Sequence, residues 1–191
     1  MSTDPAPNRI DLAAQSLVDI AAASPDRPYV VAQLGQSLDG RIATLSGHSR
    51  WINGPAALDH LHGLRAAVDA VLVGVGTVLA DNPQLTVRSR PGRHPARVVL
   101  DPSGRAPWQS KCYAGDGVRR LCITACQTDL PPGVECVVVP ATDGVIHPQS
   151  VVAELHRLGL SRILIEGGAT TISRFIDAGV VDRLQVLAGS S

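Results

Sequence analysis

The sequence predicts an α/β domain built on a mainly parallel central sheet with helices on both faces. Its 191 residues fit one ordinary domain, and 45% of the residues are hydrophobic, which is enough to form a core. Short apolar, β-branched runs alternate along the chain with segments of helical periodicity. Because parallel strands are joined by crossovers that usually contain a helix, this alternation favours a parallel sheet.

The predicted elements begin with residues 1–28, an N-terminal extension that is partly helical because Leu12, Leu17 and Ile20 recur at helical spacing. This extension is expected to dock on the domain of residues 29–191. Strands are predicted over Tyr29–Leu34, Ala70–Val75, Arg97–Leu100, Arg120–Thr124, Glu135–Val139, Arg162–Ile165 and Leu184–Leu187. Helices are predicted over Pro55–Val68, Gln149–Leu158 and Thr170–Ala178, with a short helical turn over Val78–Asp81.

Charge and apolar content exclude several classes of protein. Seventeen basic and seventeen acidic residues cancel without any run of like charge, so neither a nucleic acid nor a membrane surface is an expected partner. The chain shows no signal-peptide pattern and no window of about 18 apolar residues, so a cytoplasmic protein is expected. The four cysteines lack the C-x2-C spacing of zinc sites and are expected to be buried thiols. His60 and His62 would face different directions on a helix, and no metal is predicted.

One cation falls on the core-facing side of a predicted helix. At about 100° per residue, Leu58, Leu61, Leu64 and Val68 form one arc of the helix, and Arg65 lies inside this arc. Burying an unpaired charge is strongly unfavourable, so Arg65 needs an anionic partner. That partner is either a protein carboxylate or a phosphate group of a ligand.

Two glycine-containing turns follow predicted strands. Gly74-Val75-Gly76-Thr77 is either a tight turn or a place where a cofactor approaches the backbone closely. Glu166-Gly167-Gly168 stands between a strand and a helix, where free N–H groups and the helix dipole favour an anion such as a pyrophosphate. A purely structural turn is the alternative for this segment as well. Glu166 is at the carboxyl end of its strand, where open α/β sheets bind ligands.

Five motifs occur together and in a fixed order. They are Ser37-Leu38-Asp39-Gly40-Arg41, Ser49-Arg50-Trp51, Leu64-Arg65-Ala66, Gly74-Val75-Gly76-Thr77 and Asp81-Asn82-Pro83-Gln84-Leu85-Thr86-Val87-Arg88. In this order they resemble the reductase domain of riboflavin biosynthesis, a member of the dihydrofolate-reductase-like group. The zinc-deaminase signature, H-x-E followed by P-C-x-x-C, is missing, so the resemblance is to the reductase half alone.

The resemblance implies an NADPH-dependent reduction of a ribosylamino-pyrimidine 5′-phosphate by a protein that commonly forms homodimers. The catalytic residues it implies are Glu166 and Asp81. The substrate-binding residues it implies are Ser49, Arg65, Leu85, Arg88 and Glu166. The cofactor-binding residues it implies are Gly35, Trp51, Thr77, Asp81, Gly168, Ala169, Thr170 and Thr171.

The chain departs from the family pattern at three places. Gln33 stands where many members carry Lys, and Pro102 follows Asp101 where relatives often have a Ser near the adenosine phosphate, which leaves Ser103 or Arg105 as substitutes. Relatives continue beyond Val186 into further strands, so the domain is expected to be shortened at its C-terminus. These departures keep two alternatives open. One is a reductase of the same fold that acts on a pterin or dihydrofolate-like compound, and the other is a non-catalytic nucleotide-binding module.

Overall fold

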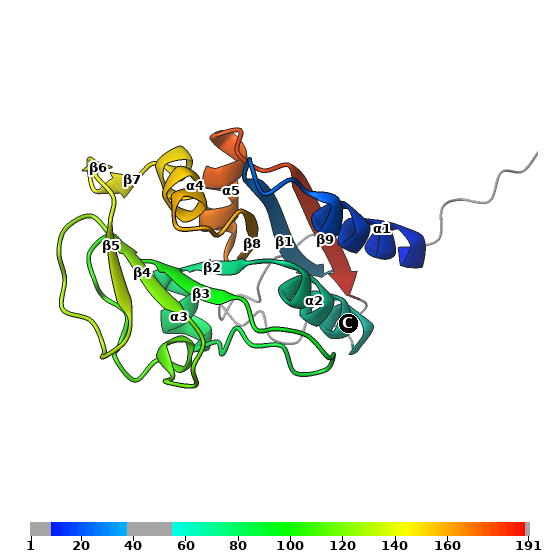
Figure 1. The fold of residues 1–191 in the computed structure, drawn as a ribbon, viewed down its shortest axis with the longest axis horizontal. Coiled ribbons are helices and arrows are strands. Elements are labelled where there is room, and N and C mark those ends of the chain that lie inside the picture. The colour runs from blue at the N-terminus through cyan, green and yellow to red at the C-terminus, as the bar shows by residue number, and fades with distance from the viewer. Residues whose placement is uncertain (1–8, 38–54, 190–191) are drawn as a thin grey trace, which may run out of the picture.

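The protein is described by a computed structural model that covers residues 9–37 and 55–189. A seven-stranded sheet runs through the molecule in the order β5-β4-β3-β2-β8-β1-β9 (Figure 1). Every neighbouring pair in it is parallel, as the sequence predicts. The strands are β1 (Tyr29–Ser37), β2 (Ala70–Gly74), β3 (Ala96–Leu100), β4 (Arg120–Thr124), β5 (Glu135–Val138), β8 (Arg162–Glu166) and β9 (Arg183–Gly189).

Helices cover both faces of this sheet. Figure 1 shows α4 (Pro148–Arg157) and α5 (Ala169–Asp177) on one side, and α2 (Pro55–Ala67) and α3 (Val75–Asp81) on the other. Helix α1 (Arg9–Ala22) lies on the same side of the sheet as α2, because its Ile20 is fully buried in the hydrophobic cluster that also contains Leu64 of α2. Helix α1 therefore packs against the domain, whereas residues 1–8 of the predicted extension lie outside the described residues.

The strand residues alternate between two separate hydrophobic cores. In β8, Ile163 and Ile165 belong to the core beneath α4 and α5, whereas Leu164 belongs to the core beneath α1, α2 and α3. The same alternation recurs in β1 and β2. Because Glu166 is two residues beyond Leu164, it faces α2. The cysteines depart from the expectation, since Cys112 and Cys122 are buried but Cys126 is exposed.

Two local elements differ from the prediction. Helix α3 begins at Val75 rather than Val78 and ends at Asp81, where it is capped by Asn82 in a left-handed conformation with φ 42°. A small antiparallel hairpin of β6 (Ala141–Thr142) and β7 (Val145–Ile146) was not predicted. Its turn, Asp143-Gly144, has positive φ at both residues, which is the geometry that two-residue hairpins require. None of the helices that the structure describes has the length and apolar character needed to cross a bilayer.

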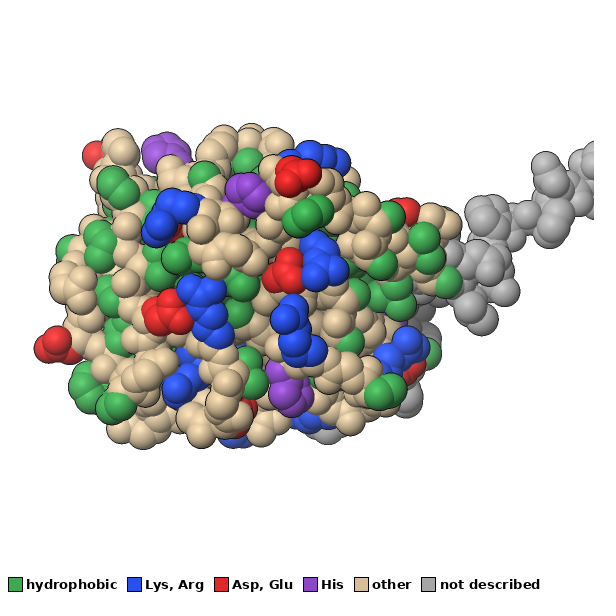
Figure 2. Space-filling model, in the orientation of Figure 1, with side chains coloured by type: hydrophobic (Ala, Val, Ile, Leu, Met, Phe, Trp, Pro, Cys, Tyr) green, Lys and Arg blue, Asp and Glu red, His purple; other side chains and the backbone are tan. Residues whose placement is uncertain are grey.

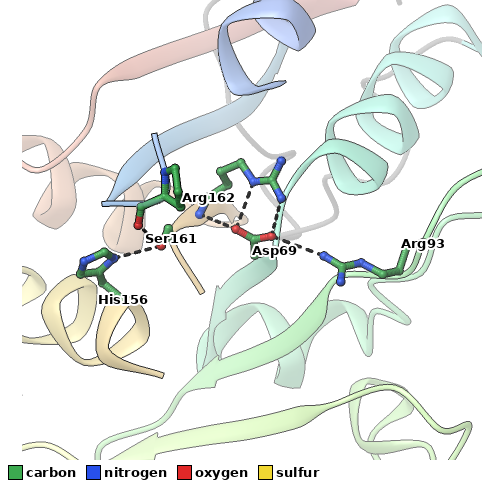
Figure 3. Close-up of polar contacts among 6 residues, drawn as sticks. Asp69, Arg93, His156, Ser161 and Arg162 are labelled. Carbon is green, nitrogen blue, oxygen red and sulfur yellow. Dashed lines mark hydrogen bonds and ion pairs between the residues drawn. The ribbon is translucent and has the colours of Figure 1, made fainter. Parts of the chain in front are cut away.

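Asp69 fastens the amino-terminal ends of neighbouring strands. Its carboxylate accepts hydrogen bonds from the backbone N–H of Arg162 at 2.9 Å, from Nη2 at 2.7 Å and from Nε at 3.1 Å (Figure 3). Its backbone N–H donates to the carbonyl of Arg162, and its own carbonyl accepts from Ala96. Burial alone would raise the pKa of Asp69, but the hydrogen bonds and charge of Arg162, with the charge of Arg93, outweigh burial and lower it.

Figure 3 shows a second contact at the same end of the strands, between His156 and Ser161. Nδ1 of His156 lies 3.0 Å from Oγ of Ser161. The Ser161 hydroxyl in turn donates to the carbonyl of Pro25 at 3.1 Å. This contact ties the segment that precedes β1 to the segment that precedes β8. The amino-terminal ends of these strands are therefore held together by structural contacts.

The Asp69→Asn variant should lower the free energy of unfolding by about 1.5 kcal/mol at neutral pH, because charge-assisted hydrogen bonds to Arg162 are weakened. Since the pKa of Asp69 is lowered in the folded protein, this stabilisation is present above the ordinary value of 3.8 and is lost as the pH falls below it. Urea unfolding followed between pH 3 and pH 7, roughly the window set by linkage, measures both effects.

The control is Glu135→Gln, which weakens the exposed pair of Glu135 and Arg119. Exposed pairs contribute about 0.5 kcal/mol or less, so this variant should stay close to the parent protein. If Asp69→Asn and Glu135→Gln lowered the free energy of unfolding equally, the structural role assigned to Asp69 would be contradicted.

Candidate active site

A cavity of about 1100 Å³ lies at the carboxyl ends of the parallel strands. Its walls include residues from the ends of β1, β2, β3 and β8, and from α2, α3 and α5. Ligands of open α/β sheets bind outside the carboxyl ends of the strands, because the loops and helix N-termini there are free of sheet packing. The position and size of this cavity make it the candidate active site.

The cavity wall is richer in positive charge than the rest of the protein. The cations that line it are Arg65, Arg88, Arg105, Lys111 and Arg174, against the carboxylates Asp81 and Glu166. The whole chain has a formal net charge of +0, and Figure 2 shows acidic and basic side chains interspersed over one face of the molecule. The excess of cations in the cavity therefore favours an anionic ligand there.

Arg65 and Glu166 form a buried ion pair in the cavity wall. Nε of Arg65 donates to Oε1 and Nη2 donates to Oε2, both at 2.7 Å. The two residues are only 6% and 7% exposed, so the pair is well shielded from water. Burial alone would lower the pKa of Arg65, but the charge and hydrogen bonds of Glu166 raise it above the ordinary value. Of the two partners that the sequence allows for Arg65, the structure supplies the carboxylate.

Arg88 lies at the end of an irregular segment that leaves α3. Its side chain is exposed, lines the cavity, and donates from Nη1 to Oε1 of Gln84 at 2.7 Å. Among the residues that the structure describes, no carboxylate pairs with it. Leu85 in the same segment is 1% exposed and has a left-handed φ of 56°, an unusual conformation for a branched side chain. Burial of Leu85 thus holds the segment that presents Arg88.

Glycines allow α3 and α5 to approach each other at the cavity. A Cβ atom added to Gly167 would lie 2.6 Å from Oγ1 of Thr77, and one added to Gly74 would lie 2.3 Å from Oγ1 of Thr171. Gly167 also has a φ of 120°, which excludes most side chains. Thr77 accepts a hydrogen bond from the N–H of Gly168 at 3.1 Å. These contacts place the two helix N-termini side by side.

The start of α5 is suited to an anion. Gly168 caps the helix without any side-chain hydrogen bond to its first turn, and the Thr171 N–H donates to the Gly168 carbonyl, so the N–H groups of Ala169 and Thr170 are left for a ligand. Gly168, Ala169, Thr170 and Thr171 all line the cavity. A cradle of glycines at a helix N-terminus fits the pyrophosphate of a dinucleotide, which needs close approach to the backbone.

The structure brings together most residues that the sequence assigns to the site. The cavity is lined by Gly35, Arg65, Thr77, Asp81, Leu85, Arg88, Glu166, Gly168, Ala169, Thr170 and Thr171. Ser49 and Trp51 lie outside the described residues. Leu58 differs from its predicted place in the core, since it is 43% exposed and lines the cavity instead.

Three cavity residues were not predicted as binding residues. Lys111 begins a short 3-10 helix, Lys111–Tyr113, and its place is fixed by a hydrogen bond from its backbone N–H to Oδ1 of Asn82, which no local pattern reveals. Gln84 lies inside a motif and could have been found as the partner of an exposed arginine. Gln33 is 5% exposed and lines the cavity, and its Nε2 has no hydrogen-bond partner among the described residues.

Replacing Glu166 by Leu should lower the free energy of unfolding by about 3 kcal/mol or more, because the buried guanidinium of Arg65 is left without a counter-charge. The double variant Arg65→Met, Glu166→Leu should lose less than the sum of the two single changes, since neither charge then remains buried alone. Urea unfolding of the four proteins gives the coupling energy.

The Glu154→Gln variant is the control, because it weakens the exposed pair with Arg157 on α4. Its effect should stay near 0.5 kcal/mol or below, about the usual value for exposed pairs. If the effects of Arg65→Met and Glu166→Leu on the free energy of unfolding were additive, the two charges would have no net coupling energy.

Comparison with known proteins supports what the geometry indicates. The 2,5-diamino-6-ribosylamino-4(3H)-pyrimidinone 5′-phosphate reductase of Methanothermobacter thermautotrophicus is 35% identical over 168 residues, covering 84% of this chain and 76% of that protein. The riboflavin biosynthesis protein RibD of Aquifex aeolicus is 32% identical over 167 residues, and the chain spans only 46% of its length.

Solved structures give the same result. A deaminase and 5-amino-6-(5-phosphoribosylamino)uracil reductase from Thermotoga maritima superposes with a TM-score of 0.70 at 35% identity, over 80% of this chain and 42% of that chain. The riboflavin biosynthesis reductase Rib7 of Saccharomyces cerevisiae superposes with a TM-score of 0.78 at 22% identity, over 96% of this chain and 84% of that chain, a likeness of fold. The expected dihydrofolate-reductase-like α/β fold is thus confirmed. The family described as the RibD C-terminal domain matches residues 28–190, and the chain belongs to this family.

Proposed function

We propose that this protein is a nicotinamide-dependent reductase of riboflavin biosynthesis that acts on a ribosylamino-pyrimidine 5′-phosphate. Membership of the RibD C-terminal domain family supports the reaction class. The observation that carries the proposal is the presence of two anion-binding features in one cavity. These are the exposed guanidinium of Arg88, which has no carboxylate partner among the described residues, and the glycine-opened N-terminus of α5.

The substrate phosphate is assigned chiefly to Arg88. Both terminal nitrogens and Nε of Arg65 already donate to Glu166 and to the carbonyl of Thr86, so Arg65 has less capacity for a ligand. Arg65 adds positive charge nearby and fixes Glu166. Phosphate binding at a distance from the reacting carbon supplies binding energy that can be used to align the sugar.

The cofactor is assigned to the groove between α3 and α5. Residues 168–171 line this groove, and the backbone N–H groups of Ala169 and Thr170 would hold the pyrophosphate, because those of Gly168 and Thr171 already donate to Thr77 and to the Gly168 carbonyl. Thr77 and Asp81 would position the nicotinamide ribose. When bound, the cofactor supplies the hydride that adds at C1′ of the opened sugar. Because both oxygens of Glu166 accept hydrogen bonds from Arg65, we assign Glu166 to positioning of the substrate rather than to proton donation.

The Arg88→Ala variant should raise KM for the phosphorylated substrate by about 10- to 100-fold, since it removes charge-assisted hydrogen bonds to the phosphate. Affinity for the nicotinamide cofactor should change little. The measurement is oxidation of the reduced cofactor, followed by absorbance with 5-amino-6-(5-phosphoribosylamino)uracil, with its 2,5-diamino-pyrimidinone counterpart, and with dihydrofolate.

Arg157→Ala is the matched control, because this arginine stands at the last position of α4, does not line the cavity and has a side chain that is 68% exposed. This variant should leave KM and kcat unchanged. Turnover with dihydrofolate alone would favour the alternative reductase, and tight cofactor binding without any turnover would favour a non-catalytic module.

NADPH rather than NADH is the proposed reductant. Arg105 and Ser103 line the cavity just after β3, and the nearest carboxylate oxygen to Arg105, Oδ1 of Asp101, is 4.0 Å away. Arg105 is therefore largely available for a 2′-phosphate, which a guanidinium binds with paired hydrogen bonds.

The Arg105→Ala variant should raise the dissociation constant of NADPH by about tenfold and leave that of NADH unchanged, because only NADPH carries the 2′-phosphate. Titration of each cofactor, followed by its fluorescence without substrate, measures this difference. Arg174→Ala is the control, since Arg174 lines the cavity from α5 and should affect both cofactors alike. Equal losses for both cofactors in Arg105→Ala would contradict the assignment.

A further inference from the structure

The segment Thr86–Arg88, which carries Arg88 into the cavity, belongs to no helix or strand. Three side chains hold its backbone instead. Nη1 of Arg65 donates to the carbonyl of Thr86 at 2.9 Å, the N–H of Val87 donates to Nδ1 of His94 at 3.1 Å, and the N–H of Arg88 donates to Nδ1 of His62 at 3.0 Å. The position of Arg88 thus depends directly on an imidazole.

The contact fixes the chemical state of His62. A nitrogen that accepts a hydrogen bond must carry a lone pair, so the ring is neutral with its proton on Nε2. A protonated imidazole donates from both nitrogens and cannot accept from Arg88. His62 is 5% exposed and does not line the cavity, so it acts on a ligand only through Arg88.

The charged groups around His62 come from three elements. Arg65 and Asp59 lie on its own helix, Arg88 on the segment it holds, and Glu166 on β8. Asp59 is itself paired with the exposed Arg90. Burial lowers the pKa of His62 below its ordinary 6.5, Arg65 and Arg88 lower it further, and Glu166 and Asp59 oppose them. The neutral ring is therefore the form present at neutral pH.

We infer that His62 is a positioning residue for the substrate phosphate, and that its neutral form is required to hold Arg88 in place. The inference rests on the proposed role of Arg88. Protonation of His62 removes the acceptor that the structure describes for the Arg88 N–H and adds a third positive charge beside Arg65 and Arg88. Both effects push the segment away from its position in the cavity wall.

His94 offers a matched comparison. It makes the same kind of contact through Nδ1, but to Val87, a residue that is 7% exposed and is therefore anchored by its own burial as well as by the histidine. His94 itself is exposed. Loss of His94 should therefore disturb Arg88 less than loss of His62.

The test compares KM and kcat of four proteins: the parent, His62→Ala, His62→Asn and His94→Ala. His62→Ala should raise KM for the phosphorylated substrate by about tenfold with kcat changed less than about twofold, and it should leave KM for the dephosphorylated substrate unchanged. His62→Asn should restore most of the affinity, because the Asn amide oxygen can take the place of Nδ1. His94→Ala should stay near the parent.

The pH profile adds a measurement that a purely structural role does not move. KM of the parent should rise as the pH falls below 6.5, the ordinary value for histidine, while His62→Asn should show a smaller rise. The substrate phosphate titrates with a pKa of about 6 and contributes equally to both proteins, so their difference reports His62. Superimposable profiles would overturn the requirement for a neutral ring.

A double variant separates the two proposals. If His62 acts through Arg88, adding His62→Ala to Arg88→Ala should raise KM no further. If Arg88→Ala raised KM strongly and His62→Ala did not change it, the role of His62 would be overturned while the role of Arg88 would stand. No effect of Arg88→Ala would overturn the phosphate assignment on which it rests. Should His62→Ala fail to fold, the pH profiles of the parent and His62→Asn still decide the question.

Discussion

The buried pair of Arg65 and Glu166 is the interaction on which the geometry of the site depends. It joins α2 to the carboxyl end of β8 through two hydrogen bonds of 2.7 Å in a region shielded from water. Neither charge can leave the other without a large desolvation cost, so the helix cannot slide along the sheet. The remaining donor of Arg65 binds the carbonyl of Thr86, which extends the same constraint to the segment that presents Arg88.

Much of the fold could be predicted from the sequence, because buried parallel strands leave a clear mark. Runs such as Ala70–Val75 and Arg162–Ile165 are apolar on both faces, and the observed β2 and β8 differ from them by one residue. The β6–β7 hairpin was missed because its strands are too short for alternation to be visible, although Asp143-Gly144 is itself a hairpin signal. Helix α3 was predicted too short because the glycines of Gly74-Val75-Gly76 suggest a loop, whereas Val75 and Val78 are buried on the core side of a real helix.

The site was only partly predictable, for a reason that lies in sequence distance. Arg65 shows from its helical position that it needs an anion, but the choice of Glu166, 101 residues away, is made by the sheet register that places β8 opposite α2. The contact between His62 and the backbone of Arg88 spans 26 residues and involves no pattern in either segment. Motifs thus identify which residues meet a ligand, while the side chains that hold those residues in place are found only from the structure.

The close contact between Gly74 and Thr171 limits the order in which this domain can change during evolution. A Cβ atom at residue 74 would lie 2.3 Å from Oγ1 of Thr171, so a side chain there requires that the hydroxyl rotates away or that residue 171 loses it, for example as alanine. The reverse order passes through an intermediate in which the Thr171 hydroxyl must leave its present position. At Gly167 even that route is closed, because the backbone itself, at φ 120°, excludes most side chains. Neighbouring branches of the family should therefore differ at residue 171 before they differ at residue 74.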